Sequence, residues 1–215
     1  MSVIVMGVKE RREREKTELR ELILDAAREL FITEGYEGVS MRKVAERIEY
    51  SPTSIYLHFA DKDELFRELC HEDFARLAVE LNVLAAEPDV VERIRHIGLA
   101  YIQFGTRYPN HYKLMFMTPH PGGELDDRDQ EVKGNPEKDA YAMLKLQVQQ
   151  GIDEGVFREE YSDADLIAQT LWSAVHGVIS LQIAKGCDGW VEWVPLESRA
   201  RIMTDAVLRG LIKEN

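Results

Sequence analysis

The chain has 215 residues, of which 45% are hydrophobic and 31% are charged, with only 7 prolines. A hydrophobic fraction of this size excludes a wholly disordered chain, and scarce proline with charge spread through periodic segments favours an all-helical protein. The formal net charge of −12 argues against a uniformly basic nucleic-acid binder.

The charge is distributed unevenly along the chain. Residues 1–60 contain 10 Lys or Arg against 11 Asp or Glu, whereas residues 61–215 contain 17 against 28. The acidity therefore belongs to the larger C-terminal part, and the N-terminal part is nearly neutral. A nearly neutral segment can still present a local basic face. The residues available for such a face are Lys9, Arg11, Arg12, Arg14, Arg42, Lys43 and Lys62.

The sequence gives no indication of export, membrane insertion or a metal site. The apolar start, SVIVMG, is too short for a signal sequence or a membrane span and has no basic residue before it. Cys70 and Cys187 lie far apart and have no metal-type spacing, as expected in a reducing compartment. We therefore expect a soluble, cytoplasmic protein without a cofactor or a membrane partner.

The first predicted helix begins at about Leu19 and ends at Gly35, a residue type that often follows a helix C-terminus. Its apolar residues recur every three or four positions. The preceding residues 9–16, KERREREK, alternate in sign. They form either a solvated extension of this helix or a basic arm that touches phosphate or the minor groove of DNA.

Two short helices follow. Ser40 is a suitable N-cap for the first, and Glu49-Tyr50 forms the turn. Ser51 caps the second helix, about residues 52–57, with Pro52 at its first position, where a missing N–H costs nothing. Two short helices joined by a tight turn are typical of a helix-turn-helix, whose second helix can enter the DNA major groove.

The rest of the chain also has helical periodicity, and we expect about nine helices in total. Residues 118–135 are rich in Pro, Gly and Asp, which predicts a loop or a partly disordered segment. Ser162, with Asp165 three residues on, is expected to open the penultimate helix. The later helices are predicted at about 62–86, 90–108, 110–117, 136–154, 163–185 and 196–213.

The region from about Leu22 to Leu69 resembles the TetR family of transcriptional regulators. The resemblance lies in ILDAARELFITEGYEGVSMRKVAERI, then SPTSIYLHF, then DKDEL at the start of the fourth helix. It implies an N-terminal three-helix head with a helix-turn-helix, residues 1–62, and a larger helical body for ligand binding and dimerisation, residues 63–215. The chain departs from the family pattern at Glu49, where the family often has Gly. Glu49 must adopt left-handed backbone angles at some cost, or the turn must bend differently.

The resemblance also implies a set of DNA contacts. Thr53 and Ser54 would reach base edges, while Tyr56, His58 and Lys62 would contact phosphate. Ser40 and Arg42 would approach the DNA backbone from the preceding helix. The full predicted DNA-binding set is Ser40, Arg42, Pro52, Thr53, Ser54, Tyr56, His58 and Lys62. For His58, packing beside Phe59 is an equally good expectation.

A second segment, LWSAVHGVISL, resembles one TetR subgroup through its Trp172, His176 and Gly177. This resemblance raises the expectation of a ligand cavity in the body, with His176 as its main polar contact. Ordinary packing is the alternative for any one residue. Side chains that could line the cavity are Tyr101, Phe104, Tyr108, Tyr112, Met115, Phe116, Met143, Trp172 and His176. All of these except Tyr112 form the predicted ligand-binding set. Gly177 in mid-helix predicts a closely approaching neighbouring helix.

One head has few base contacts, so we expect a homodimer whose two heads bind a palindromic operator. The candidate interface residues on the last two helices are Leu171, Val175, Ile179, Val207, Leu208 and Leu211, although some of these may pack in the monomer core. The implied function is a repressor released from double-stranded DNA by a small, largely apolar effector.

Two alternatives stay open. The body could instead dock a protein partner, or the regulator could act without a ligand. A helical enzyme is disfavoured because the chain has no His-x-x-x-His motif, no phosphate-binding Gly-rich loop and no nucleophile elbow.

Overall fold

The computed structural model describes residues 7–119 and 125–213. Within these ranges the chain is helical, apart from turns and one isolated bridge between Phe157 and Ile212. This confirms the predicted all-α fold. The helices form two compact units. Unit 1 comprises Met1–Glu72 with Lys113–Gly122, and unit 2 comprises Asp73–Tyr112 with Gly123–Asn215.

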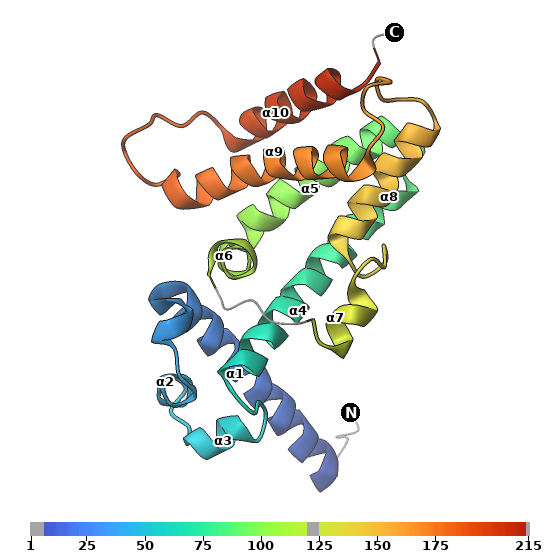
Figure 1. Cartoon of the computed structure of the whole chain (residues 1–215). Coiled ribbons are helices and arrows are strands. Elements are labelled where there is room, and N and C mark those ends of the chain that lie inside the picture. The colour runs from blue at the N-terminus through green and yellow to red at the C-terminus, as the bar shows by residue number, and fades with distance from the viewer. Residues whose placement is uncertain (1–6, 120–124, 214–215) are drawn as a thin grey trace, which may run out of the picture. The chain divides into compact units, whose positions relative to one another are not determined.

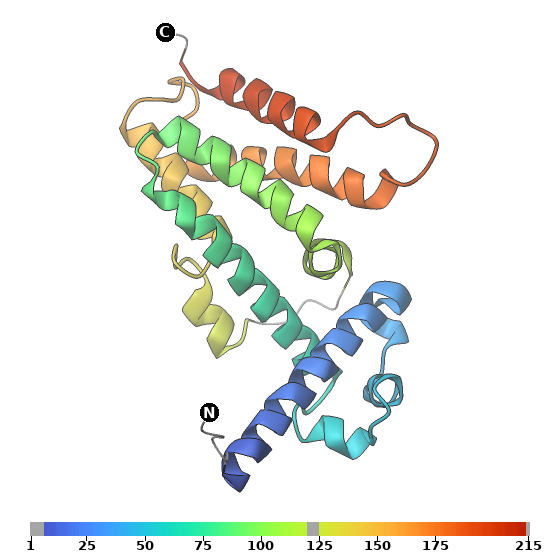
Figure 2. The same cartoon turned by 180° about the vertical axis from the view of Figure 1, so that it is seen from behind.

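Unit 1 contains the helix-turn-helix. Its helices are α1 (Val8–Gly38), α2 (Met41–Arg47), α3 (Pro52–Tyr56) and the first part of α4 (Lys62–Asn82). The end of α6 (Pro109–Met117) also belongs to this unit. In both views α2 and α3 lie beside α1 (Figures 1 and 2).

The capping residues expected from the sequence hold the short helices in place. The Ser40 side chain accepts a hydrogen bond from the Lys43 N–H at 3.3 Å, and the Ser51 side chain accepts one from the Ser54 N–H at 3.2 Å. Asp61 Oδ1 accepts from the Glu64 N–H at 2.7 Å at the start of α4. Each cap satisfies a helix N–H that has no partner within its own helix.

The first helix differs from its predicted limits at both ends. It begins at Val8, so residues 9–16 extend the helix instead of forming a loose arm. Near its end Gly35 has φ 72° and ψ 169°, which interrupts the helical path before Gly38. This backbone conformation is essentially restricted to glycine. Gly35 therefore fixes the bend that leads the chain into α2.

The turn between α2 and α3 contains the one non-glycine residue with positive φ in the described part of the chain, Glu49 at 60°. The Tyr50 N–H donates to the Ala45 carbonyl at 2.9 Å, and the Glu49 N–H donates to the Glu46 carbonyl at 3.3 Å. This pair of bonds is the Schellman arrangement, which requires a left-handed residue at the Glu49 position. Of the two possibilities raised by the sequence, Glu49 therefore adopts the left-handed conformation.

Replacing Glu49 with glycine should raise the free energy of unfolding by about 0.5–1 kcal/mol. Glycine removes a left-handed penalty of about 1–2 kcal/mol but adds flexibility to the unfolded chain. Urea unfolding followed by circular dichroism measures the change. The control is Glu46→Gly, inside α2, which should lower stability by about 1 kcal/mol. Equal destabilisation by both variants would contradict this account of the turn.

The core of unit 1 buries one face of each helix. Ring pairs Phe31–Phe66 and Tyr36–Phe66 meet at 5.0 and 5.3 Å between centroids. Ile55 of α3 is fully buried, so α3 is held against the core by its inner face. Other members of this core are Ile23, Leu24, Ala27, Leu30, Val44, Ala45, Phe59, Leu65, Leu69 and Leu114.

Unit 2 is a helical bundle in which α5 packs against α8, α9 and α10. In both views α9 and α10 run side by side (Figures 1 and 2). Besides the rest of α4 and the start of α6, its elements are the 3-10 turn η1 (Val83–Ala86), α5 (Val90–Arg107), α7 (Asp127–Val132), α8 (Ala140–Asp153), α9 (Ala164–Lys185) and α10 (Leu196–Leu211).

Two local predictions in unit 2 are wrong. Residues 118–135 are not a loop throughout, since α7 forms within them with Asp126 as its N-cap, while residues 120–124 lie outside the described ranges. Asp163, not Ser162, caps α9, because its carboxylate accepts from the Asp165 and Leu166 N–H groups at 2.9 and 3.2 Å. Asp-rich segments favour helix N-termini as well as loops, which explains the first error.

Candidate functional site

The outer surface of α3 is the first candidate site. Pro52, Thr53 and Tyr56 are exposed on it, with Tyr56 at 55% exposure. Ser54 is half-buried, and its hydroxyl lies 2.9 Å from the Ser51 hydroxyl. The exposed side chains offer two hydroxyls and a methyl group that no core contact requires. The sequence therefore builds a short helix whose outer face is free to bind another molecule.

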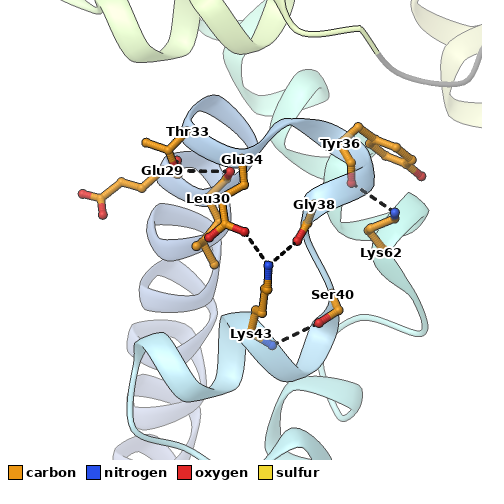
Figure 3. Close-up of polar contacts among 9 residues, drawn as sticks. All are labelled: Glu29, Leu30, Thr33, Glu34, Tyr36, Gly38, Ser40, Lys43 and Lys62. Carbon is orange, nitrogen blue, oxygen red and sulfur yellow. Dashed lines mark hydrogen bonds and ion pairs between the residues drawn. The ribbon is translucent and has the colours of Figure 1, made fainter.

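Two lysines fix the bend that positions α2 and α3. Lys43 Nζ lies 2.5 Å from Glu34 Oε2 and donates to the Gly38 carbonyl at 2.7 Å, as Figure 3 shows. Lys62 Nζ donates to the Tyr36 carbonyl at 3.1 Å and lies 4.1 Å from the centre of the Tyr36 ring. These lysines hold the segment after Gly35 against the neighbouring helices.

The remaining predicted polar contacts lie at the edges of this surface. Ser40 is exposed at the N-terminus of α2, and Arg42 is exposed but paired with Glu46 at 2.8 Å. His58 is half-buried just after α3. Burial, followed by the charges of Lys16 and Arg20, lowers the pKa of His58 below its usual value. At neutral pH the imidazole is therefore uncharged, and any contact it makes with an anion is through a neutral N–H donor.

A connected set of polar aromatic side chains lies inside unit 2. The Trp172 Nε1–H donates to the Tyr101 hydroxyl at 3.0 Å. The Tyr101 and Tyr112 hydroxyls are 3.1 Å apart, and the Tyr112 hydroxyl is 2.5 Å from His176 Nδ1. Tyr101 and Tyr112 are buried, whereas Trp172 and His176 are half-buried. We call these four residues the aromatic cluster.

The Trp172 indole can only donate, so Tyr101 accepts from it. The Tyr101 hydroxyl also lies 3.3 Å from His176 Nδ1, so the two hydroxyls and this ring nitrogen all lie within hydrogen-bond distance of one another. Burial raises the pKa of Tyr101 to about 12 and also raises that of Tyr112, while burial lowers the pKa of His176. All four groups are therefore uncharged at neutral pH, which suits a site for an uncharged or largely apolar molecule.

Close packing at Gly105 positions Tyr112 within this cluster. A Cβ at Gly105 would lie 2.5 Å from Ile179 Cγ1 and 2.9 Å from Tyr112 Cδ2. A side chain there would push the Tyr112 ring or α9 away. Nothing in the sequence singled out Gly105, and Tyr112 was only one of the possible cavity-lining residues, because the roles of both depend on the packing of α5, α6 and α9.

Protonation of His176 should destabilise the folded protein. Since its folded pKa is lowered, the unfolded chain binds the proton more readily, and stability is lost as the pH falls from about 6.5 through the folded pKa. We expect His176→Gln to lose less stability than the wild type between pH 7 and pH 5. Gln can still accept from Tyr112 but does not titrate. Urea unfolding at the two pH values measures this, and equal losses would refute the assignment.

The other predicted ligand residues are distributed more widely. Phe104 and Met143 are buried in unit 2, and Tyr108 is half-buried with Arg76 lying 5.1 Å from its ring centre. Met115 is buried and Phe116 half-buried, but both belong to unit 1. Of the predicted set, the observed hydrogen bonds bring together Tyr101, Trp172 and His176, joined by Tyr112.

The predicted dimer-interface residues are mostly part of the monomer core. Val207 is half-buried, and the other five are buried: Leu171, Val175, Ile179, Leu208 and Leu211. The outer faces of α9 and α10 instead carry exposed residues without charge, which we call the uncharged stripe. Its members are Leu166, Thr170, Ser173, Gly177, Leu181 and Ala184 on α9, and Ile202, Ala206 and Gly210 on α10.

The stripe also corrects the prediction for Gly177. Apart from the adjacent residues and the nearby backbone of the same helix, no described atom lies within 4 Å of a Cβ built at Gly177 or at Gly210, so no neighbouring helix of the described chain approaches Gly177 closely. By length and composition alone, α9 could span a membrane, and 28% of its most apolar 18-residue segment is buried. It is the one such helix in the described residues.

Two family models match the chain. Residues 23–69 match the bacterial regulatory proteins of the tetR family, and residues 94–207 match the tetracyclin repressor-like C-terminal domain. The second match alone covers more than half of the chain. The chain belongs to the TetR family. The membership predicted from the N-terminal motifs is therefore confirmed, and TetR-family members are transcriptional regulators, not enzymes.

Individual relatives support this assignment over different lengths. The HTH-type transcriptional repressor AcnR of Corynebacterium diphtheriae is 41% identical over 76 residues, which is 35% of this chain and 38% of AcnR. The chain thus matches little more than a third of that relative's length. A protein of unknown function from Rhodococcus sp. RHA1 has a similar fold, with a TM-score of 0.70, 22% identity and coverage of 99% of this chain and 100% of that one.

A third similar structure is a complex of SmeT with triclosan. Its TM-score is 0.64 at 19% identity, and the match covers 91% of this TetR-family chain and 92% of SmeT. At this identity the likeness concerns the fold. Both matches include most of unit 1 and of unit 2, so each unit shares the fold of the corresponding helices in these structures.

Proposed function

We propose that this protein is a homodimeric transcriptional repressor that binds a palindromic DNA operator and is released by a small-molecule effector. The main support for the proposal is that α3, in a TetR-family chain, has one buried face and one face exposed to solvent. Ile55 is fully buried, while Thr53 and Tyr56 face solvent. Residues 1–62 would form the DNA-binding domain, and residues 63–215 the regulatory and dimerisation domain.

In this proposal the α3 surface makes two kinds of contact. Pro52, Thr53 and Ser54 lie at the start of α3, the part of a recognition helix that approaches base edges. Thr53 can hydrogen-bond a base and offer its methyl group to thymine. Tyr56, His58 and Lys62 would contact phosphates on one side, with Ser40 and Arg42 doing so from the start of α2. The phosphate contacts set the register, and the base contacts supply the specificity.

Dimerisation would use the uncharged stripe. Every exposed residue of α9 from Leu166 to Ala184 is uncharged, and an exposed helical face of this length is expected to be covered by a partner. Gly177 and Gly210 would allow the partner's helices to approach closely. Two α9–α10 pairs would then form a four-helix interface. The apolar composition of α9 serves this association in our proposal, and the protein acts in the cytoplasm at DNA.

The effector would bind at the aromatic cluster. Its members Trp172 and His176 are only half-buried, and the uncharged hydrogen-bonding groups of the cluster can pair with one polar group of a largely apolar molecule. SmeT, a protein of similar fold, forms a complex with triclosan. Phe104, Tyr108 and Met143, which also lie in unit 2, would supply the remaining apolar contacts.

Release from DNA would be a shift between two populations. The effector must bind a dimer whose heads are wrongly spaced for the operator better than it binds the DNA-competent dimer. α4 begins in unit 1 and ends in unit 2, and α6 also has residues in both units. These two helices are therefore the covalent path by which a change at the cluster would reach the DNA-binding unit.

The test uses compounds that raise the thermal stability of the purified protein. A compound that stabilises the Tyr112→Phe variant less than the wild type is taken to bind at the aromatic cluster. Such compounds should lower the affinity for an operator duplex at constant salt, since affinity changes at different salt cannot be compared. The effector part of the proposal fails if such compounds leave operator affinity unchanged.

A further inference from the structure

The basic residues of unit 1 fall into two groups. Those within and beside the helix-turn-helix have internal partners: Arg42 with Glu46, Lys43 with Glu34, Arg47 with Glu29 and Lys62 with Tyr36. On the N-terminal part of α1, Arg11 pairs with Glu15 at 3.3 Å and Arg14 with Glu18 at 3.5 Å. Within the described residues, Lys9, Arg12 and Lys16 form no ion pair, and all three are exposed.

These three residues share one face of α1. Their spacing of three and four residues places them in a row, about 10 Å long at 1.5 Å per residue. The same spacing continues through Arg20 to the buried residues Ile23 and Ala27. The row therefore prolongs the core-facing side of α1 beyond the end of the core. Glu13 lies at the edge of this face and offsets one of the three positive charges.

The row begins next to the end of α3. Arg20 donates to Glu68 and Glu72 of α4 at 2.5 and 2.7 Å, and its guanidinium lies 5.5 Å from the Phe59 ring centre. Lys16 lies one turn before Arg20, and its charge acts on His58. Both views show the N-terminal half of α1 passing beside α3 (Figures 1 and 2). The row therefore starts beside the proposed DNA-binding surface and extends away from it.

Helix stability does not explain these charges. The first turn of a helix favours anions, because its free N–H groups and dipole are positive there. Lys9 lies in that turn, and neither Arg12 nor Lys16 gains an ion pair in the described chain. An exposed, unpaired row of cations on a rigid helix is instead suited to a row of phosphates, which follow one another every 3.4 Å along each strand of DNA.

We propose that Lys9, Arg12 and Lys16 form a phosphate-binding row that contacts the DNA backbone outside the base pairs touched by α3. The proposal rests on the DNA binding proposed above. α1 then enlarges the footprint of each head by about three base pairs of backbone without adding sequence specificity. Because the row is part of α1 and not a loose arm, it is ordered before DNA binds.

The experiment compares two double variants of the full-length protein on a duplex selected from random DNA, with at least ten base pairs of flank on each side. Arg12→Gln/Lys16→Gln removes two charges from the row. Arg11→Gln/Arg14→Gln removes two paired charges from the same segment of the same helix. Dissociation constants are measured over a range of salt concentrations, and circular dichroism checks that both variants remain folded.

We expect the first variant to lower the slope of log affinity against log salt by about 1.8 per head, since each lost phosphate contact contributes about 0.9. The second should keep nearly the wild-type slope. Trimming the flanks should abolish the difference between wild type and the first variant, and mismatched sites should be weakened as much as matched ones. Equal slopes for the two variants would refute phosphate binding by the row and would leave the proposed function intact. A wild-type protein that binds no duplex would overturn both.

Discussion

Replacing Thr53 and Tyr56 together with alanine should lower affinity for the selected operator by about 100-fold or more while leaving the protein folded. Each side chain is exposed on α3, so the core does not depend on it. We take the Thr53 base contact and the Tyr56 phosphate contact together as about 1.4 kcal/mol per head, near the low end of the about 1–3 kcal/mol of a good bidentate base contact, which corresponds to a factor of ten. A tenfold loss of affinity at each of the two heads gives a total loss of about 100-fold. Fluorescence anisotropy with labelled duplex at fixed salt gives the affinity.

The variant also separates specific from non-specific binding. Affinity for unrelated duplex should fall less, because it loses only the Tyr56 phosphate contact and keeps those of His58 and Lys62. Leu146→Ala is the control, since Leu146 is also half exposed but lies on α8 in unit 2. If operator affinity survived in the double variant, or if Leu146→Ala weakened it equally, α3 would not be the recognition helix.

Introducing charge into the uncharged stripe should convert the protein to a monomer. In Leu181→Glu/Ile202→Glu both substituted positions are exposed, at 45% and 67%, so the monomer fold should tolerate them. In a two-fold interface each variant chain would bring two carboxylates into the same apolar contact, at a cost of several kcal/mol. Sedimentation should then give the mass of one 24.7 kDa chain instead of two.

Loss of the dimer should also abolish tight operator binding, because the second head no longer benefits from the binding of the first. Val79→Glu is the matched control. Val79 is exposed to 66% on α4, away from the stripe, and this variant should remain dimeric. A stripe variant that stays dimeric would place the interface elsewhere on unit 2.

The sequence predicted the local structure of unit 1 well because each element is determined by its own residues. Ser40, Ser51, Pro52 and Asp61 each define a helix start through a short-range hydrogen bond or a fixed φ. The sequence left two possibilities for Glu49: a left-handed backbone conformation or a turn of another shape. The hydrogen bonds donated by the Tyr50 and Glu49 N–H groups show that the first is correct.

Unit 2 was less predictable because the roles of its residues depend on contacts far apart in sequence. The sequence could not divide the apolar residues of α9 and α10 between core and outer surface. Leu171 and Leu208, candidates for either role, are buried in the core of unit 2. The importance of Tyr112 arises from hydrogen bonds that span α5, α6 and α9. No local pattern encodes such a meeting of three helices.

Selection of bound fragments from random duplex DNA, using the full-length protein, tests the paired use of α3 most directly. Our account predicts a two-fold symmetric consensus whose half-sites are separated by about 34–36 Å, one helical turn, or by a multiple of it. Protection of the selected site should extend on both sides beyond the conserved base pairs. A consensus without symmetry, or the recovery of no preferred sequence at all, would contradict it.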